Sequence, residues 1–186
     1  MSIRSIQFFF FILALTVVVF AVAYFGGALL LPTASSDSSG NEIVTGGLVG
    51  SRAPDFDLPD IEGTHVRMSD FTDTPLIITF WSTWNSDALN QLQILDSFAA
   101  DEKGRGLVAA IAIDSQEERS LARTYVRRGG YRLPTLVDSL GSVGDAYGVN
   151  SLPMTYFVDR SGIIREVVRG VVSKRQLVDK LEGILR

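Results

Sequence analysis

A nearly continuous apolar run, Leu76 to Trp81, lies near the middle of this chain. A strand with one face in water alternates polar and apolar residues, whereas a run of this kind predicts a central strand that is covered on both faces. The residues that follow the run predict a helix, because apolar side chains recur there at helical spacing, at Ala88, Leu92, Leu95 and Ala99.

A second apolar run, Leu107 to Ile113, is ended by Asp114 and repeats the arrangement. The helix predicted after it extends from Glu117 to Arg128, with Leu121 and Tyr125 facing inward. Strands that alternate with helices in this way are typical of an α/β domain.

Shorter elements are predicted on either side of these two units. "HVRMSDF", with the turn Glu62-Gly63 before it, predicts a strand pair near the start of the domain. "DRSG" predicts a hairpin turn between two further strands. Ser173 and Gln176 match a capping box, which predicts a last helix that buries one apolar face. The remaining predicted elements are strands over 135–137, 155–158 and 163–168 and a short helix over 143–147.

The amino-terminal region is predicted to be a membrane anchor over residues 1–31. Ile6 to Leu31 is almost wholly apolar and is long enough to cross a bilayer as a helix. A cleaved signal peptide is the alternative, since Ala21-Val22-Ala23 has the small residues of a cleavage site. The apolar run continues beyond that site, which favours an uncleaved anchor.

Arg4 precedes the apolar run, and no other basic residue follows it until Arg52. The positive-inside rule therefore places the amino terminus in the cytoplasm and the rest of the chain outside the cytoplasmic membrane. Residues 32–48 are rich in Ser, Gly and Thr and are predicted to form a flexible linker. Residues 49–186 then form the folded domain.

Composition excludes several kinds of site. The formal net charge is −4, which gives no basic surface for nucleic acid, so no nucleic-acid partner is predicted. The chain has no cysteine and one histidine, His65, and we predict neither a metal site nor a cofactor. Thiol nucleophiles, disulfides and zinc–thiolate sites are excluded together.

The order of the predicted elements, with three sequence segments, resembles the thioredoxin fold, and in particular the membrane-anchored thiol-disulfide oxidoreductases of the TlpA and ResA type. "VGSRAPDFDLPDIEGTHVRMSDF" is similar to the family's amino-terminal extension, and "PLIITFWSTW" to its central strand and active-site approach. "YGVNSLPMTYFVDRSGII" is similar to its cis-proline loop and the hairpin that follows. The resemblance implies a central mixed sheet flanked by helices, in a domain that covers Val49 to Arg186.

The resemblance fails at the catalytic positions. Where the family has Cys-x-x-Cys at the start of a helix, this chain has Asn85 and Ala88, and Thr79 stands where thioredoxins have a buried acid. Asparagine is among the best residues for capping a helix, because its side-chain oxygen accepts a bond from a free backbone N–H. Asn85 is therefore predicted to cap the helix at the place where a thiolate would lie, which leaves a degenerate site with no catalytic residue.

A binding groove is nevertheless predicted at this site. Trp81 is expected to pack in the core and Trp84 to lie near the surface. The resemblance implies that Pro153 is in the cis form and that the backbone of Leu152 pairs with an extended peptide. The groove candidates are thus Trp84, Asn85, Leu152 and Pro153.

Other polar groups are weaker candidates. His65 is predicted to lie in an exposed hairpin, and Met68 and Met154 are predicted to pack in the core rather than to bind Cu(I). Ser86 and Asp87 have no base nearby in the sequence and predict no hydrolase. A row of arginines on the helix after Ser115 is interpreted as a solvated face, with a surface for an acidic partner or lipid headgroups as the alternative; these are Arg119, Arg123 and Arg127.

Three functions remain open at this level. The first is a non-catalytic, membrane-tethered module that holds a protein or peptide partner outside the cytoplasmic membrane. The second is a redox protein of the family type, a thiol-disulfide oxidoreductase or peroxidase acting in cytochrome c maturation, which would depend on a thiol of its partner. The third is a domain kept as a structural part of a membrane complex.

Overall fold

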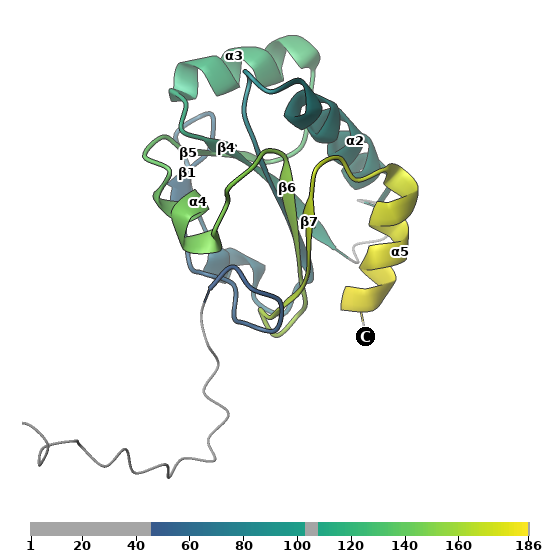
Figure 1. Cartoon of the computed structure of the whole chain (residues 1–186). Helices are drawn as coiled ribbons and strands as arrows, with labels where there is room; N and C mark the ends of the chain where they lie inside the picture. The colour runs from purple at the N-terminus through teal and green to yellow at the C-terminus, as the bar shows by residue number, and fades with distance from the viewer. Residues whose placement is uncertain (1–45, 103–107, 186) are drawn as a thin grey trace, which may run out of the picture. The chain divides into compact units, whose positions relative to one another are not determined.

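A mixed five-stranded sheet, in the order β5–β4–β3–β6–β7, forms the centre of the domain (Figure 1). The computed structural model describes residues 46–102 and 108–185. β3, β4 and β5 are parallel to one another, whereas β6 and β7 are antiparallel to their neighbours. The strands are β3 (Leu76–Trp81), β4 (Ala109–Ser115), β5 (Thr135–Asp138), β6 (Met154–Val158) and β7 (Ile164–Arg169).

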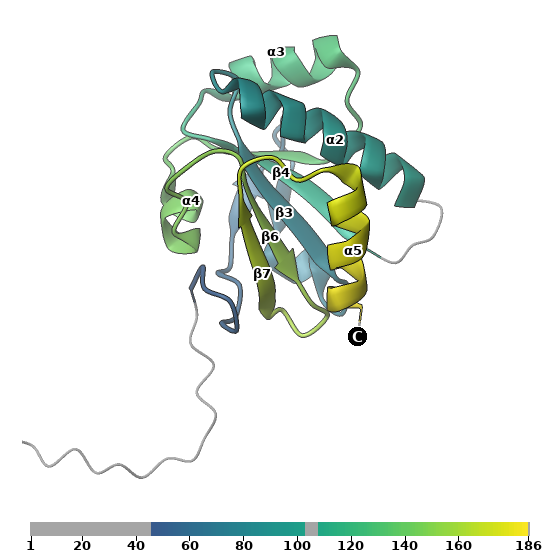
Figure 2. The ribbon, with the colours of Figure 1, turned by 45° about the vertical axis from the view of Figure 1, so that its right-hand side comes forward.

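Each face of the sheet has its own apolar core. All residues of β3 are buried, and alternate side chains point to opposite faces, as predicted for a strand covered on both sides. Ile77 and Trp81 pack against one layer of helices, and Figure 2 shows two of these, α2 and α5, over that face of the sheet. The helices of this layer are α2 (Ser86–Glu102), α3 (Arg119–Gly129) and α5 (Lys174–Ile184).

The opposite face of the sheet packs against the amino-terminal part of the domain and one short helix. Ile78 and Phe80 of β3 belong to this second core, together with Tyr147 of α4 (Ser142–Tyr147). The amino-terminal part contains a two-stranded antiparallel sheet and a short 3-10 helix; these elements are β1 (Asp57–Pro59), β2 (His65–Arg67) and η2 (Met68–Phe71).

The structure confirms the predicted strand pair, the central strand, the hairpin at "DRSG" and the last helix. Ser173 and Gln176 form the predicted capping box, and α5 buries its predicted apolar face of Leu177, Leu181 and Ile184. Met154 lies in the core, and Met68 packs against its edge, as predicted. His65 is in the predicted exposed hairpin and pairs with Asp57.

Two predicted elements differ in detail from the structure. β4 continues to Ser115, so that Asp114 lies inside the strand instead of ending it. α3 begins at Arg119, and its buried residues are Ala122 and Val126, whereas Leu121 is 53% exposed. The inward-facing prediction for Leu121 was wrong because the face of α3 that packs against the core carries Ala122 and Val126 instead.

The predicted anchor, residues 1–31, and most of the predicted linker lie outside the described residues. Within 46–102 and 108–185, no helix combines the length and the apolar character needed to cross a bilayer.

Candidate functional site

Asn85 connects the start of α2 to the loop before β6. Its side-chain Oδ1 accepts a hydrogen bond of 2.9 Å from the backbone N–H of Ala88, which is the predicted helix cap. Its Nδ2 donates to the backbone carbonyl oxygen of Leu152 at 3.2 Å. One amide side chain thus satisfies a free N–H at the helix start and a free carbonyl in a loop that lies 67 residues further along the chain.

The predicted groove residues lie on these two connected segments. The ring of Trp84 is 68% exposed, whereas Trp81 is fully buried, as predicted. The Leu152–Pro153 peptide bond is cis, and the carbonyl oxygen of Pro153 accepts a hydrogen bond from the N–H of Gly170. Leu152 is half-buried and Pro153 is buried, so that Trp84 is the most exposed of the apolar groove candidates.

The carboxylate of Glu117 is hydrogen-bonded to the turn that carries Trp84. It accepts a hydrogen bond from the backbone N–H of Thr83 at 2.6 Å and another from the Thr83 hydroxyl at 2.5 Å. Hydrogen bonds to a carboxylate are roughly twice as strong as those between neutral groups, so this pair fixes the backbone just before Trp84.

Asp114 is a residue of β4 that lies beside Glu117, and it is fully buried. Neither of its carboxyl oxygens has a hydrogen-bond partner among the described residues, and the same is true of Trp81 Nε1 and Ser82 Oγ. Burial, reinforced by the neighbouring Glu117, raises the pKa of Asp114 to about 9. A neutral carboxyl group is therefore the form held in the folded protein at neutral pH.

Asp114 was not among the residues singled out from the sequence. Its one signal there is position, since it directly follows an apolar run and precedes Glu117 by three residues. The sequence does not show that β3 lies beside it, with Trp81 opposite Asp114 in the strand register.

The other family-related positions carry no ionisable group. Thr79 Oγ1 hydrogen-bonds Thr155 Oγ1 at 2.9 Å in the core, where the resemblance places an acid. Ala88 is fully buried and offers no reactive atom. Gln91, one turn further along α2, is also buried and accepts a hydrogen bond from the N–H of Val172.

This arrangement has no group that could exchange a disulfide. The whole chain lacks cysteine, so no thiolate can form at the helix start. Within the described ranges, no group of three or more His, Cys, Asp and Glu side chains is placed to hold a metal ion. What remains at the site is an exposed indole beside backbone groups and an amide side chain.

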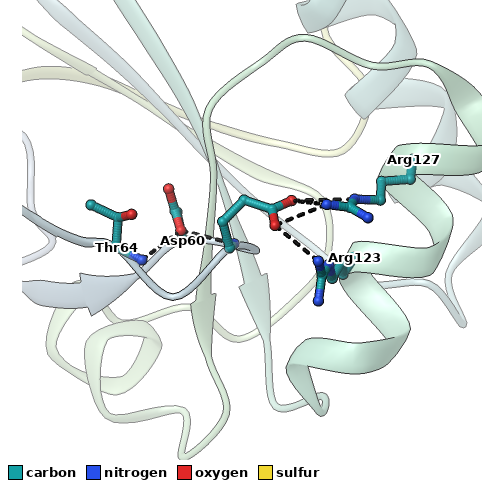
Figure 3. A network of polar contacts seen from close by, with 5 residues as sticks. Asp60, Thr64, Arg123 and Arg127 are labelled. Atoms are coloured by element: carbon teal, nitrogen blue, oxygen red, sulfur yellow. Dashed lines mark hydrogen bonds and ion pairs between the residues drawn. The ribbon is translucent and has the colours of Figure 1, made fainter.

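The arginine row of α3 is partly neutralised by one carboxylate of the β1–β2 turn. Asp60 accepts hydrogen bonds from the N–H groups of Glu62 and Thr64 and so shapes this turn. The Glu62 carboxylate forms ion pairs with Arg123, at 3.0 Å, and with Arg127, at 2.9 Å (Figure 3). Pairing across segments that are distant in sequence makes the row a structural contact between α3 and the β1–β2 turn.

Comparison with known proteins identifies the family to which the chain belongs. The family model described as AhpC/TSA matches residues 49–167, more than half of the chain. The chain belongs to the AhpC/TSA family. Among the curated proteins of similar sequence, thiol-disulfide oxidoreductase ResA of Geobacillus thermodenitrificans is 29% identical over 136 residues, which cover 73% of this chain and 78% of that protein. ResA of Bacillus anthracis is 27% identical over 136 residues, with the same two shares covered.

Solved structures agree with this member of the AhpC/TSA family in fold. A thiol:disulfide interchange protein of the thioredoxin family from Chlorobium tepidum superposes with a TM-score of 0.65 at 19% identity, over 73% of this chain and 96% of that one. The exposed lipoprotein thioredoxin Etrx1 of Streptococcus pneumoniae has a TM-score of 0.64 at 25% identity, over 70% of this chain and 99% of that one. The domain thus has a thioredoxin-like fold, with the implied mixed sheet and flanking helices.

Proposed function

We propose that this chain is a non-catalytic binding module of the thioredoxin-like family, tethered to the cytoplasmic membrane by residues 1–31 with the domain on the extracytoplasmic side. The observation that carries the proposal is Asn85. Its side chain caps α2 and bonds to Leu152 in a chain that contains no cysteine. The scaffold of a thiol-disulfide oxidoreductase is retained, while the group that would react with a disulfide is absent.

The ligand best suited to this site is an extended segment of a partner protein. Trp84 offers an exposed aromatic ring, and rigid aromatic residues are the commonest anchors of protein interfaces. The Leu152 carbonyl oxygen bonds to Asn85, but a carbonyl has two lone pairs and can accept a second bond from a peptide N–H. A segment in this position would be bound reversibly, by backbone pairing and apolar contact.

A redox protein that borrows a thiol from its partner is the second candidate. Similarity to ResA, a thiol-disulfide oxidoreductase, favours it. Against it stands the mechanism of exchange, which passes through a mixed disulfide and so needs a sulfur atom on each protein. A purely structural role within a membrane complex, the third possibility, predicts that the groove binds nothing.

Reduction of insulin by dithiothreitol tests whether the chain by itself has thiol-disulfide activity. We expect the natural chain to give no acceleration over a heat-treated sample. The variant Asn85→Cys with Ala88→Cys provides the positive control, since two cysteines three positions apart at a helix start can form a disulfide. Its turnover should be weak, because Thr79 offers no buried acid. Activity of the natural chain above the heat-treated sample would exclude the non-catalytic reading.

Crosslinking tests the groove itself. A photo-crosslinking amino acid in place of Ser86, an exposed residue two positions after Trp84, in the full chain in its own membranes, should form adducts with a partner. Leu152→Asp places a charge beside the groove and should reduce the adduct yield several-fold. Val178→Asp makes a similar change on α5, at a side chain that is 38% exposed, and should leave the yield unchanged. Equal yields in all three proteins would favour the structural role.

A further inference from the structure

The turn formed by residues 46–52 presents two adjacent apolar side chains to solvent. Leu48 is 72% exposed and Val49 is 63% exposed. The buried Ser51 closes the turn: its N–H donates to the carbonyl oxygen of Leu48 at 3.1 Å, and its hydroxyl lies within hydrogen-bond reach of the carbonyl oxygens of Gly46 and Leu48. The fold therefore holds both apolar side chains in a defined exposed position.

This turn lies at the end of the sheet opposite to the Trp84 site. It is bonded to the β6–β7 hairpin, through Gly50 N–H to the Ile164 carbonyl oxygen at 2.8 Å and Ala53 N–H to the Gly162 carbonyl oxygen at 2.9 Å. The hairpin follows Val158, whereas Leu152 precedes the other end of the same strand, β6, which spans about 17 Å at the usual rise of a strand. Figure 1 shows the turn beside the hairpin and away from the start of α2.

Each of these two bonded segments, the turn and the hairpin, carries one arginine. Arg52 and Arg160 are both exposed, and neither has an ion pair within the part of the chain that the structure describes. The neighbouring acid Asp159 is occupied by Arg165, at 2.6 Å, and by backbone N–H groups of the hairpin. Asp55 is exposed in the same segment and offsets part of the positive charge, so that apolar contact carries most of the attraction.

We propose that this surface, made of Leu48, Val49, Arg52 and Arg160, rests on the lipid bilayer to which the chain is anchored. The proposal depends on the membrane tether of the proposed function. Two apolar side chains are too few to hold a free domain on a membrane. A linker of the predicted length keeps the turn at a high effective concentration near the lipid, where weak contacts suffice. Guanidinium groups at the rim match the phosphates of lipid headgroups.

The orientation that follows has a consequence for binding. With the 46–52 turn on the bilayer, the Trp84 site points away from the membrane and toward the aqueous space. A partner would then approach from the solution side or through a domain that projects from the membrane.

The absence of cysteine makes the proposal directly testable, because a single introduced cysteine can be labelled uniquely. The full chain is placed in nanodiscs of phosphatidylcholine with about one quarter phosphatidylglycerol, a composition that supplies the anionic headgroups of a bacterial membrane. An environment-sensitive fluorophore is attached at Leu48→Cys or, as a control, at Leu140→Cys, an exposed leucine near the Trp84 end of the sheet. Spin-labelled lipids should quench the fluorophore at position 48 several-fold more than at position 140. Equal, water-like emission at both positions would overturn the proposal.

A reporter outside the turn avoids changing the surface under test. A fluorophore attached at Ser161→Cys, in the adjacent hairpin, should also be quenched by spin-labelled lipids. Adding Leu48→Ser and Val49→Ser should abolish this quenching, whereas adding Leu140→Ser should not. Persistent quenching in the double serine variant, or none in the natural turn, would overturn the lipid contact, and a protein partner would then be the alternative occupant.

Alkaline carbonate extraction distinguishes this proposal from the proposed tether. A chain that stays with the lipid but shows no quenching at position 48 would contradict the bilayer contact alone. A chain released into the wash would contradict the tether, and the bilayer contact with it.

Discussion

Asp114 is a carboxyl group that the domain buries completely, with no hydrogen-bond partner for either oxygen among the described residues. Placing a charged carboxylate there would cost far more than placing a neutral acid, because burial removes the water that stabilises the charge. The raised pKa of about 9 expresses this preference. Strongly perturbed acids are common at functional sites, and this one lies beneath the turn that carries the proposed anchor Trp84.

The raised pKa of Asp114 predicts a loss of stability as pH increases. Between its ordinary pKa near 3.8 and its folded pKa of about 9, the folded chain binds a proton that the unfolded chain releases. The free energy of unfolding should therefore fall by about 1.4 kcal/mol per pH unit from this group between pH 5 and 8. Asp114→Asn, a neutral isostere, should remove this slope and be the more stable protein at pH 8.

Urea denaturation at several pH values measures both effects. Asp179→Asn, which alters an exposed acid of α5, is the matched control and should keep the slope of the natural chain. An unchanged slope in Asp114→Asn would show that the buried acid does not hold its proton.

At the scale of elements, the start of α2 and the loop before β6 are joined by one side chain. The side chain of Asn85 accepts a hydrogen bond from the first turn of α2 and donates one to the loop. Glu117 is bonded to Thr83 in the turn that precedes α2. The side chain at the position where the resemblance places a reactive thiol thus strengthens the helix start and links it to a second segment.

Two substitutions at Asn85 separate its two contacts. Asn85→Ala loses both and should lower the free energy of unfolding by about 1 kcal/mol, the usual cost of removing a helix cap. Asn85→Asp keeps the acceptor for the Ala88 N–H but cannot donate to Leu152, so it should retain most of the stability. Hydrogen exchange of the backbone amides of residues 150–152 should be faster in both variants. Exchange that changes only in Asn85→Ala would show that the bond to Leu152 contributes nothing.

At the scale of the whole molecule, the two ends of the sheet differ in character. One end carries Trp84 and the cis-proline loop, and the other carries the exposed pair Leu48 and Val49. In the membrane contact proposed above, this second end faces the bilayer and the Trp84 site faces the aqueous space.

The proposed topology predicts accessibility from one side of the membrane. Protease added to intact spheroplasts should remove the domain, because Arg4 before the apolar run directs the amino terminus to the cytoplasm. Full protection in intact spheroplasts, with digestion after lysis, would reverse the orientation. Recovery of a shortened domain in the soluble fraction would favour a cleaved signal peptide.

Local patterns were enough to predict most elements. The apolar run of β3, the helical spacing of α2 and the capping box of α5 are interactions within a few residues, which a single sequence displays directly. The cap at Asn85 was predictable for the same reason, since donor and acceptor are three positions apart. The α/β class also followed, because buried strands that alternate with amphipathic helices have few ways to cover both faces of a sheet. The thioredoxin-like fold was inferred from the resemblance of three segments to a known family.

Tertiary structure alone decided the contacts that shape the site. Thr83 and Glu117 are 34 positions apart, and Asn85 and Leu152 are 67 apart, so neither pair leaves a local signal. The exposure of Leu121 depends on which face of α3 meets the core, and Ala122 and Val126 occupy that face. Asp114 acquires its raised pKa only when β3 packs beside β4 and excludes water from its carboxyl group. Sequence patterns record the preferences of neighbouring residues, whereas burial and long-range pairing arise when distant segments meet.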